Sequence, residues 1–227
     1  STRLPRPRAS TIVATVRSPV SAMPVRSRLL SLLLMLPWST AWADAPLVLI
    51  LGDSLSAAHG MPVEAGWPAL LAKRLDERGD GRVINASISG ETTSGGLTRL
   101  PALLAEHQPE VLVIELGAND GLRGLPIRQI RSNIEAMIGQ ASAAQAEVIL
   151  LGIELPVNFG RRYRSQLRAV YAELAQAHDL GLVPFLLEGV ALEPELMQDD
   201  GLHPTAQAQP RLLDNVWPVL ERALAVD

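Results

Sequence analysis

Five short, mainly apolar segments recur along residues 46–224, and each is followed by a longer stretch that mixes apolar and polar residues. In most of these segments the apolar residues run continuously instead of alternating with polar ones. Continuous short runs are typical of strands that are buried on both faces of a sheet. The predicted strands are residues 46–51, 82–86, 111–116, 147–153 and 182–185.

The stretches that follow these segments place apolar residues at helical intervals, which predicts amphipathic helices. The predicted helices are residues 67–77, 92–105, 126–144, 161–177 and 205–224. Pro101 is expected to bend the second helix, because proline lacks the N–H that a helical hydrogen bond needs. The last helix has to accommodate Pro210 and Pro218.

Strands that alternate with helices in units of about 30 residues predict right-handed βαβ connections and a parallel sheet covered on both faces. We therefore expect a single α/β domain over residues 44–227, with three layers and a doubly wound, flavodoxin-like sheet of order 2-1-3-4-5. In such a sheet the functional crevice lies at the carboxyl ends of the strands, near the switch between the first and third strands.

The first 43 residues differ in composition from the rest of the chain. They carry six arginines and no acidic residue. A basic segment (residues 23–28) precedes an apolar run (29–36), and small residues then lead to Ala41-Trp42-Ala43. This order is the signature of a cleaved secretory signal peptide. We expect cleavage after Ala43 and a periplasmic or secreted protein.

The apolar run of this segment is much shorter than the ~20 residues that a membrane-spanning helix needs, so stable membrane insertion is not expected. A permanent amphipathic anchor is the alternative interpretation. Residues 1–22 contain no Met and are interpreted as an upstream extension or a mis-set start.

The charge and the cysteine content of the chain exclude some classes of partner and of metal site. The chain has 20 basic and 24 acidic residues, and six of the basic ones precede residue 44, so the remainder is distinctly acidic. An acidic body repels phosphate backbones, and nucleic acid is not an expected partner. Cysteine is absent, which excludes disulfides and thiolate metal sites. A chain of this length can bury a core without a partner, and a monomer is expected.

Four polar clusters follow predicted strands or precede the last helix, where the fold places its crevice. The first, Gly-Asp-Ser-Leu-Ser, occupies residues 52–56. The second covers residues 85–93, and the third, Gly-Ala-Asn-Asp, covers residues 117–120. The fourth, Asp-Asp-Gly-Leu-His-Pro, covers residues 199–204.

These clusters contain the groups that acyl transfer by a serine requires. Ser54 follows the first strand, where a helix beginning nearby would present backbone N–H groups to a developing anion. Asp200 and His203 are three residues apart around a glycine, so the carboxylate can contact the imidazole and support its protonated form. Gly90 can present an unobstructed backbone N–H, and the Asn119 amide is a neutral donor.

Each cluster also has a structural interpretation when it is taken alone. The serine, glycine and asparagine could cap a helix or shape a turn, and the fourth cluster could be a solvated turn with a surface histidine. The functional interpretation is favoured because all four occur together, in chain order, around one predicted crevice. Asp53 and Asp120 are assigned structural roles, and the other histidines, His59, His107 and His178, are expected to face solvent.

The four clusters resemble the sequence blocks of SGNH (GDSL) hydrolases, whose invariant serine, glycine, asparagine and histidine correspond to Ser54, Gly90, Asn119 and His203. Longer segments are similar to the bacterial periplasmic branch of that family, which comprises thioesterase I, arylesterase and lysophospholipase. These segments are residues 52–57, 67–71, 85–90, 116–124 and 155–163. The resemblance extends over nearly all of residues 44–227.

The resemblance implies a serine esterase and thioesterase that acts on aryl esters, acyl-CoA and lysophospholipids through an acyl-enzyme, without a metal or an organic cofactor. It implies a triad of Ser54, His203 and Asp200. It also implies an oxyanion hole made by the backbone N–H groups of Ser54 and Gly90 together with the Asn119 amide.

The segment 152–159 follows the fourth strand and is expected to border the crevice, where the resemblance implies a mobile substrate-binding loop. Leu155, Pro156 and Phe159 give this segment an apolar character that suits an acyl chain. Packing of the same residues into the core beneath the loop is the alternative.

Two other functions remain open. A carbohydrate O-acetyl esterase would use the same four blocks, although the apolar 152–159 segment and the aromatic content of 4% favour lipid-like acyl groups. A flavodoxin-like binding or electron-transfer module would share the fold. An α/β-hydrolase is excluded, because Ser54 lies in Gly-Asp-Ser-Leu-Ser and not in Gly-x-Ser-x-Gly.

Overall fold

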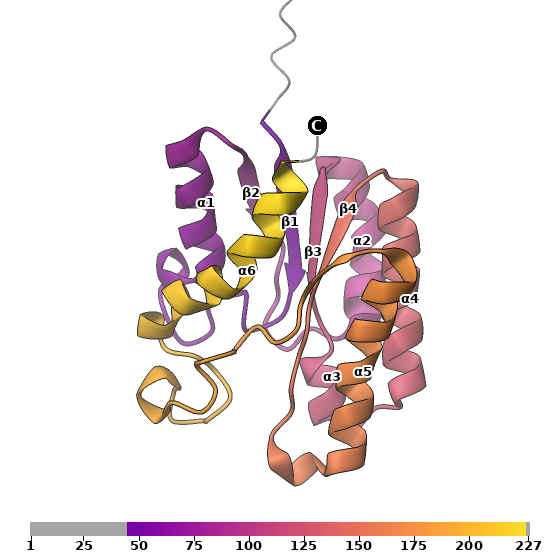
Figure 1. The fold of residues 1–227 in the computed structure, drawn as a ribbon, viewed down its shortest axis with the longest axis vertical. Helices are drawn as coiled ribbons and strands as arrows, with labels where there is room; N and C mark the ends of the chain where they lie inside the picture. Colours follow the sequence, from indigo (N-terminus) through magenta and orange to yellow (C-terminus); the bar gives the residue numbers. More distant parts are fainter. Residues whose placement is uncertain (1–44, 226–227) are drawn as a thin grey trace, which may run out of the picture. The chain divides into compact units, whose positions relative to one another are not determined.

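The computed structural model describes residues 45–225, which form a five-stranded parallel sheet with helices on both faces (Figure 1). The predicted signal peptide, its cleavage after Ala43 and the extension of residues 1–22 lie outside the described residues. The strands run in the order β2-β1-β3-β4-β5, which confirms the predicted α/β, doubly wound fold. They are β1 (Leu47–Gly52), β2 (Arg82–Asn85), β3 (Val111–Glu115), β4 (Glu147–Leu151) and β5 (Gly181–Val183).

Two groups of helices cover the two faces of the sheet (Figure 1). They are α1 (Trp67–Arg78), α2 (Thr93–His107), α4 (Ile127–Ala143), α5 (Arg161–His178) and α6 (Gln209–Leu224). Helices α1 and α6 lie on one face, and α2, α4 and α5 lie on the other. Within residues 45–225, no helix combines the length and the apolar character that crossing a membrane requires.

Successive residues of the central strands point into two separate apolar cores. Leu49 and Leu51 pack with α2, α4 and α5, whereas Val48 and Ile50 pack with α1 and α6. All four side chains are fully buried. Burial on both faces is the physical reason for the continuous apolar runs in the sequence.

The register of β1 against β3 determines where polar groups can meet. Gly52 pairs with Glu115 at the carboxyl ends of the two strands, so the segments that follow them begin side by side. A side chain at position 52 would not fit, because its Cβ would lie 2.8 Å from the Glu115 carboxylate and 2.8 Å from Ser87 Oγ. Asn85 ends β2 beside Ile50, which brings the second cluster to the same edge.

Some elements differ in detail from those predicted. A separate 3₁₀ turn, η4 (Ala206–Ala208), precedes α6, so Pro210 lies in the first turn of the helix, where no N–H is needed. Pro101 and Pro218 lie inside α2 and α6. A five-residue helix, α3 (Ala118–Leu122), follows β3 and is absent from the predicted elements. The other short 3₁₀ helices are η1 (Val63–Ala65), η2 (Val157–Phe159) and η3 (Pro194–Leu196).

Candidate active site

Ser54 lies on a tight turn directly after β1. No regular helix begins there, contrary to expectation: residues 54–60 form consecutive turns, with hydrogen bonds from the Ala57 N–H to the Asp53 carbonyl and from the His59 N–H to the Ser54 carbonyl. The Asp53 carboxylate also accepts the N–H of Leu55 at 3.1 Å. The turn holds Ser54 half-buried, with its hydroxyl directed at the loop before α6.

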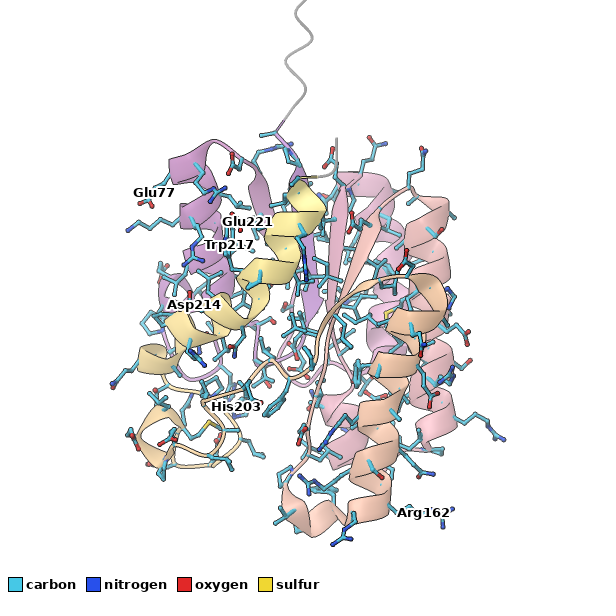
Figure 2. All side chains as sticks on the ribbon, viewed as in Figure 1. Glu77, Arg162, His203, Asp214, Trp217 and Glu221 are labelled. Carbon is cyan, nitrogen blue, oxygen red and sulfur yellow. The ribbon has the colours of Figure 1, made fainter. Side chains whose placement is uncertain are left out.

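The predicted base lies on that loop, and Figure 2 shows His203 there, below the start of α6. His203 Nε2 is 2.9 Å from Ser54 Oγ, and His203 Nδ1 is 2.6 Å from Asp200 Oδ2. The other Asp200 oxygen accepts the backbone N–H groups of Leu202 and His203, at 2.8 and 3.0 Å. These bonds fix the carboxylate against the imidazole. They favour the tautomer in which Nδ1 donates and Nε2 accepts.

The carboxylate of Asp200 remains charged in this position. Its hydrogen bond with the His203 side chain is the main cause that lowers the pKa of Asp200 to about 2. The backbone N–H groups of Leu202 and His203 act in the same direction. Asp200 is therefore ionised at neutral pH and can stabilise a protonated His203.

Of the expected oxyanion donors, the structure brings Ser54 and Asn119 to the same pocket. Asn119 lies in α3, and its Nδ2 donates to Asp53 Oδ2 at 2.9 Å, which fixes the amide. Gly90 is exposed and does not line this pocket. Within residues 45–225, no group accepts a hydrogen bond from the backbone N–H of Ser54 or Gly90.

Gly90 has φ +82°, and a side chain there would meet no neighbour within 4 Å. Arg123 donates to the Gly90 carbonyl at 3.1 Å. This bond holds the peptide between Gly90 and Glu91, whereas the Gly90 N–H belongs to the preceding peptide.

The buried carboxylate of Glu115, which the sequence interpretation missed, holds the turn that carries Ser54. Glu115 Oε2 accepts the Asp53 N–H at 3.1 Å and the Ser56 hydroxyl at 2.9 Å, and both Glu115 and Asp53 are fully buried. Burial raises the pKa of Asp53 to about 6 and the pKa of Glu115 well above its usual value, and the nearby Asp53 charge raises the latter further. Glu115 therefore holds its proton in preference to Asp53. A single acidic residue within the apolar run 111–116 was the available signal.

Asp120 has the structural role expected of it. Its carboxylate accepts the backbone N–H of Thr93 at 2.9 Å and the Thr93 hydroxyl at 2.5 Å. Asn133 of α4 donates to the same hydroxyl at 2.9 Å. This buried group joins α3 to the first residue of α2 and to α4.

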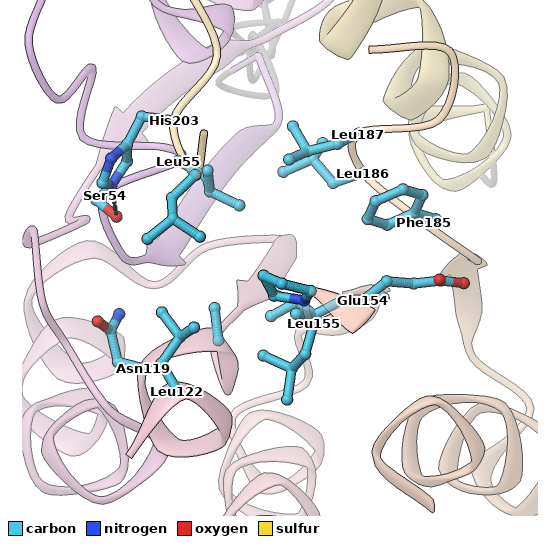
Figure 3. Close-up of a pocket in the computed structure, with 15 residues that line it drawn as sticks. Ser54, Leu55, Asn119, Leu122, Glu154, Leu155, Phe185, Leu186, Leu187 and His203 are labelled. Atoms are coloured by element: carbon cyan, nitrogen blue, oxygen red, sulfur yellow. Dashed lines mark hydrogen bonds between the residues drawn. The ribbon is translucent and has the colours of Figure 1, made fainter. Parts of the chain in front are cut away.

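An apolar cavity of about 230 Å³ extends from Ser54 (Figure 3). Figure 3 shows Ser54 and His203 at one end of it and Phe185 at the other. Its lining is mainly aliphatic and aromatic, with Leu122, Leu155, Pro156, Phe185, Leu186 and Leu187 among the lining residues. Leu155 and Pro156 line it as expected, but Phe159 does not, because its half-buried side chain packs against the apolar core on the α2, α4 and α5 face of the sheet. The wall formed by residues 185–187 was missed by sequence reasoning.

His59 faces solvent as expected, but it also lies against the site. Its side chain is exposed, but its ring centroid is only 4.2 Å from that of His203. His178 is exposed, and His107 is half-buried at the end of α2. Together with Asp200, the His59 and His203 side chains form a group that could hold a metal ion.

Comparisons with known proteins identify similar hydrolases. Residues 50–210 match the model of the GDSL-like lipase/acylhydrolase family. Esterase TesA of Pseudomonas aeruginosa is 52% identical over 201 residues, covering 88% of this chain and all of that protein. Thioesterase 1/protease 1/lysophospholipase L1 of Escherichia coli K12 is 47% identical over 182 residues, covering 80% of this chain and 86% of that protein. A crystal structure of TesA, 53% identical, superposes with a TM-score of 0.76 over 78% of this chain and 99% of its own.

Proposed function

The chain belongs to the GDSL-like lipase/acylhydrolase family, and we propose that it hydrolyses acyl esters and thioesters through an acyl-enzyme formed on Ser54. The observation that carries the proposal is the hydrogen-bonded chain from Asp200 through His203 to Ser54, at the mouth of an apolar cavity. Family membership sets aside the flavodoxin-like electron carrier as an alternative.

The reaction begins when Ser54 Oγ attacks the acyl carbonyl carbon and His203 Nε2 takes the hydroxyl proton. Asp200 stabilises the resulting imidazolium. The negative charge that develops on the carbonyl oxygen is met by the Asn119 amide and by the free backbone N–H groups of Ser54 and Gly90. Asn119 contributes without reorganisation, because Asp53 already holds its amide in place.

Collapse of the tetrahedral intermediate breaks the bond to the leaving oxygen or sulfur, which takes the proton from His203. Water then attacks the acyl-enzyme, and His203 removes a proton from it. The carboxylic acid leaves and the Ser54 hydroxyl is restored. The cycle uses only groups of this chain and one water molecule.

The shape of the cavity favours aliphatic acyl groups over acetylated sugars. Phe185, Leu186 and Leu187 line its far end and offer no polar side-chain group to sugar hydroxyls. The acidic lining residue, Glu154, is paired with Arg164 and Arg168. Relatives named arylesterase and thioesterase/lysophospholipase support a substrate class of aryl esters, thioesters and lysophospholipids. Acyl-CoA is the thioester that we propose. A carbohydrate O-acetyl esterase is the second candidate within this chemistry.

We further infer that the enzyme is exported to the periplasm or secreted, with cleavage after Ala43, and that it acts as a monomer. The basic, apolar and small-residue order of residues 23–43 supports export. Amino-terminal sequencing of the exported protein tests this inference, and a first residue other than Asp44 would contradict the cleavage site.

The proposed function is tested with p-nitrophenyl esters from acetyl to palmitoyl and with palmitoyl-CoA, comparing the wild-type chain with Ser54→Ala. Hydrolysis of medium and long chains that is lost in the variant is the expected result. Hydrolysis confined to the acetyl ester would keep the mechanism and favour the sugar esterase. Hydrolysis that persists in Ser54→Ala would contradict the proposal.

A further inference from the structure

A second histidine lies against the proposed base. The ring centroids of His59 and His203 are 4.2 Å apart, with the ring planes tilted by 37°. The ligand atoms of His59, His203 and Asp200 all lie within 4.8 Å of one another. Two ligands bound to one tetrahedral zinc ion at about 2.0–2.2 Å are about 3.3–3.6 Å apart. Small side-chain rotations would therefore bring all three residues to one ion.

The backbone of this cluster is fixed, whereas the His59 side chain is free to turn. Gln198 Nε2 donates to the carbonyls of His59 and Pro204, at 2.8 and 2.9 Å, which ties the turn after β1 to the loop before α6. Gly60 makes room for this amide, because a Cβ there would lie 2.3 Å from Gln198 Oε1. His59 is exposed and can reorient towards an ion, and 42% of the Asp200 side chain is exposed, so an ion can reach its carboxylate from solvent.

We propose that His59, Asp200 and His203 bind a divalent transition-metal ion of the zinc type, and that the bound ion reversibly inhibits the hydrolase. Two imidazoles and one carboxylate, with a fourth position for water, are a ligand set that Zn²⁺ accepts. Imidazole also suits the neighbouring transition metals, whereas Ca²⁺ and Mg²⁺ prefer oxygen ligands. The inhibition rests on the proposed role of His203 as the base.

Binding of the ion is incompatible with that role whichever ring nitrogen it uses. A neutral imidazole has one N–H and one nitrogen lone pair. An ion on Nε2 would displace the Ser54 hydroxyl. An ion on Nδ1 would replace the proton that Asp200 accepts there, and the proton of the neutral imidazole would then lie on Nε2. In both cases His203 cannot accept the proton of Ser54.

His59 supplies the third ligand of the proposed metal site, because the triad alone supplies only two, Asp200 and His203. Even outer-shell partners of a protein-bound metal are worth about 10–100-fold in affinity. Loss of His59, a direct ligand, is therefore expected to weaken zinc binding by at least about 10-fold. His178 is a matched control, since it is also an exposed histidine but lies at the end of α5.

The test titrates ZnSO₄ into the wild-type chain, His59→Ala, His178→Ala and Ser54→Ala, in a buffer without phosphate. Zinc binding is measured by calorimetry, and ester hydrolysis is scaled to each variant's own zinc-free rate. We expect one zinc ion per wild-type chain and inhibition that EDTA reverses. The half-inhibiting zinc concentration should rise at least about 10-fold in His59→Ala and stay constant in His178→Ala. Ser54→Ala should still bind zinc.

Equal zinc affinity or equal inhibition in His59→Ala and the wild type would overturn the proposal. Absence of binding and of inhibition in the wild type would overturn it as well, and would leave the proposed hydrolase function intact. A third outcome is that zinc binding depends on His59 but the chain shows no Ser54-dependent hydrolysis. That outcome would overturn the proposed function and, with it, the claim that zinc inhibits the hydrolase.

Discussion

The two halves of the site are built in different ways. The half that holds Ser54 and Asn119 rests on the ends of β1 and β3, where Asp53 and Glu115 are fully buried. The half that holds the base is a loop, in which 42% of the Asp200 side chain is exposed. In the first half, contacts between residues more than 60 positions apart fix the geometry. In the second, residues three positions apart fix each other.

This difference has opposite electrostatic consequences for the two supporting carboxylates. Burial raises the pKa of Asp53 to about 6, whereas the hydrogen bond with His203 lowers the pKa of Asp200 to about 2. The buried charge costs folding free energy, while the exposed charge costs little because water still solvates it. We therefore expect changes in the loop half to affect activity alone, and changes in the strand half to affect activity and stability together.

The largest effect is expected for Asp200→Asn, which should lower kcat by about 10²–10⁴-fold, because the amide favours the wrong tautomer of His203. The midpoint of thermal unfolding should hardly change. The control is Asp199→Asn at the exposed neighbouring position, which should leave kcat unchanged. Kinetics and calorimetry on both variants check this. An equal loss of activity in Asp199→Asn would show that the orienting role does not belong to Asp200 alone.

A smaller effect is expected for Asn119→Ala, with a decrease in kcat of about 10²–10³-fold and little change in KM, because the amide acts on the transition state. Stability should also fall by about 1–3 kcal/mol, since buried Asp53 loses a donor. Asn133→Ala is the control, because it removes another amide of the buried network, one that does not line the cavity. It should lower stability without lowering kcat. An undiminished kcat in Asn119→Ala would remove this residue from the mechanism.

The pH dependence of stability tests the buried half directly. Because the pKa of Asp53 is raised from 3.8 to about 6, the folded chain keeps a proton that the unfolded chain releases within this window. The free energy of unfolding should therefore fall as pH rises from about 3 to about 7, by roughly 3 kcal/mol in all from this residue. Urea denaturation of Asp53→Asn at several pH values should give a correspondingly flatter curve. An unchanged slope would contradict the raised pKa.

The smallest effect concerns the two phenylalanines of the chain. Phe185 lines the cavity and Phe159 does not. Phe185→Ala should lower kcat/KM for octanoyl esters by about 5–20-fold, because apolar contact area is lost, and should leave acetyl esters unaffected. Phe159→Ala should not alter the ratio between the two substrates. If Phe159→Ala and Phe185→Ala changed the chain-length preference equally, Phe159 would have to be a substrate contact as well.

The same pair shows how far the sequence could predict the site. The strand and helix periods, and the rule that parallel strands end at one edge, correctly brought Ser54, Asn119 and His203 together. They did not identify Phe185, because the fifth strand was predicted to extend to this residue, whereas β5 ends at Val183 and Phe185 lies in the segment that follows. They also did not show that Phe159 packs away from the cavity, because the direction of a loop side chain depends on the packing around it.

Long-range register limited the prediction in a similar way. Glu115 supports the Ser54 turn because it pairs with Gly52, and no local pattern specifies that register. Helix α3 is too short to show a helical period, and it follows Gly117, whose φ of +123° suits glycine alone. The contact of His59 with His203 arises because Gln198 ties the turns of residues 54–60 to the loop before α6, a long-range contact that no local pattern specifies.

The central claim, that Ser54 is a nucleophile activated by His203, is tested most directly by covalent capture. The wild-type chain is treated with a fluorophosphonate, and the modified peptide is identified by mass spectrometry. The account predicts one phosphonyl group per chain, on Ser54, with none in Ser54→Ala and much slower labelling in His203→Ala. A stable adduct on another residue, or labelling of Ser54 that does not depend on His203, would contradict it.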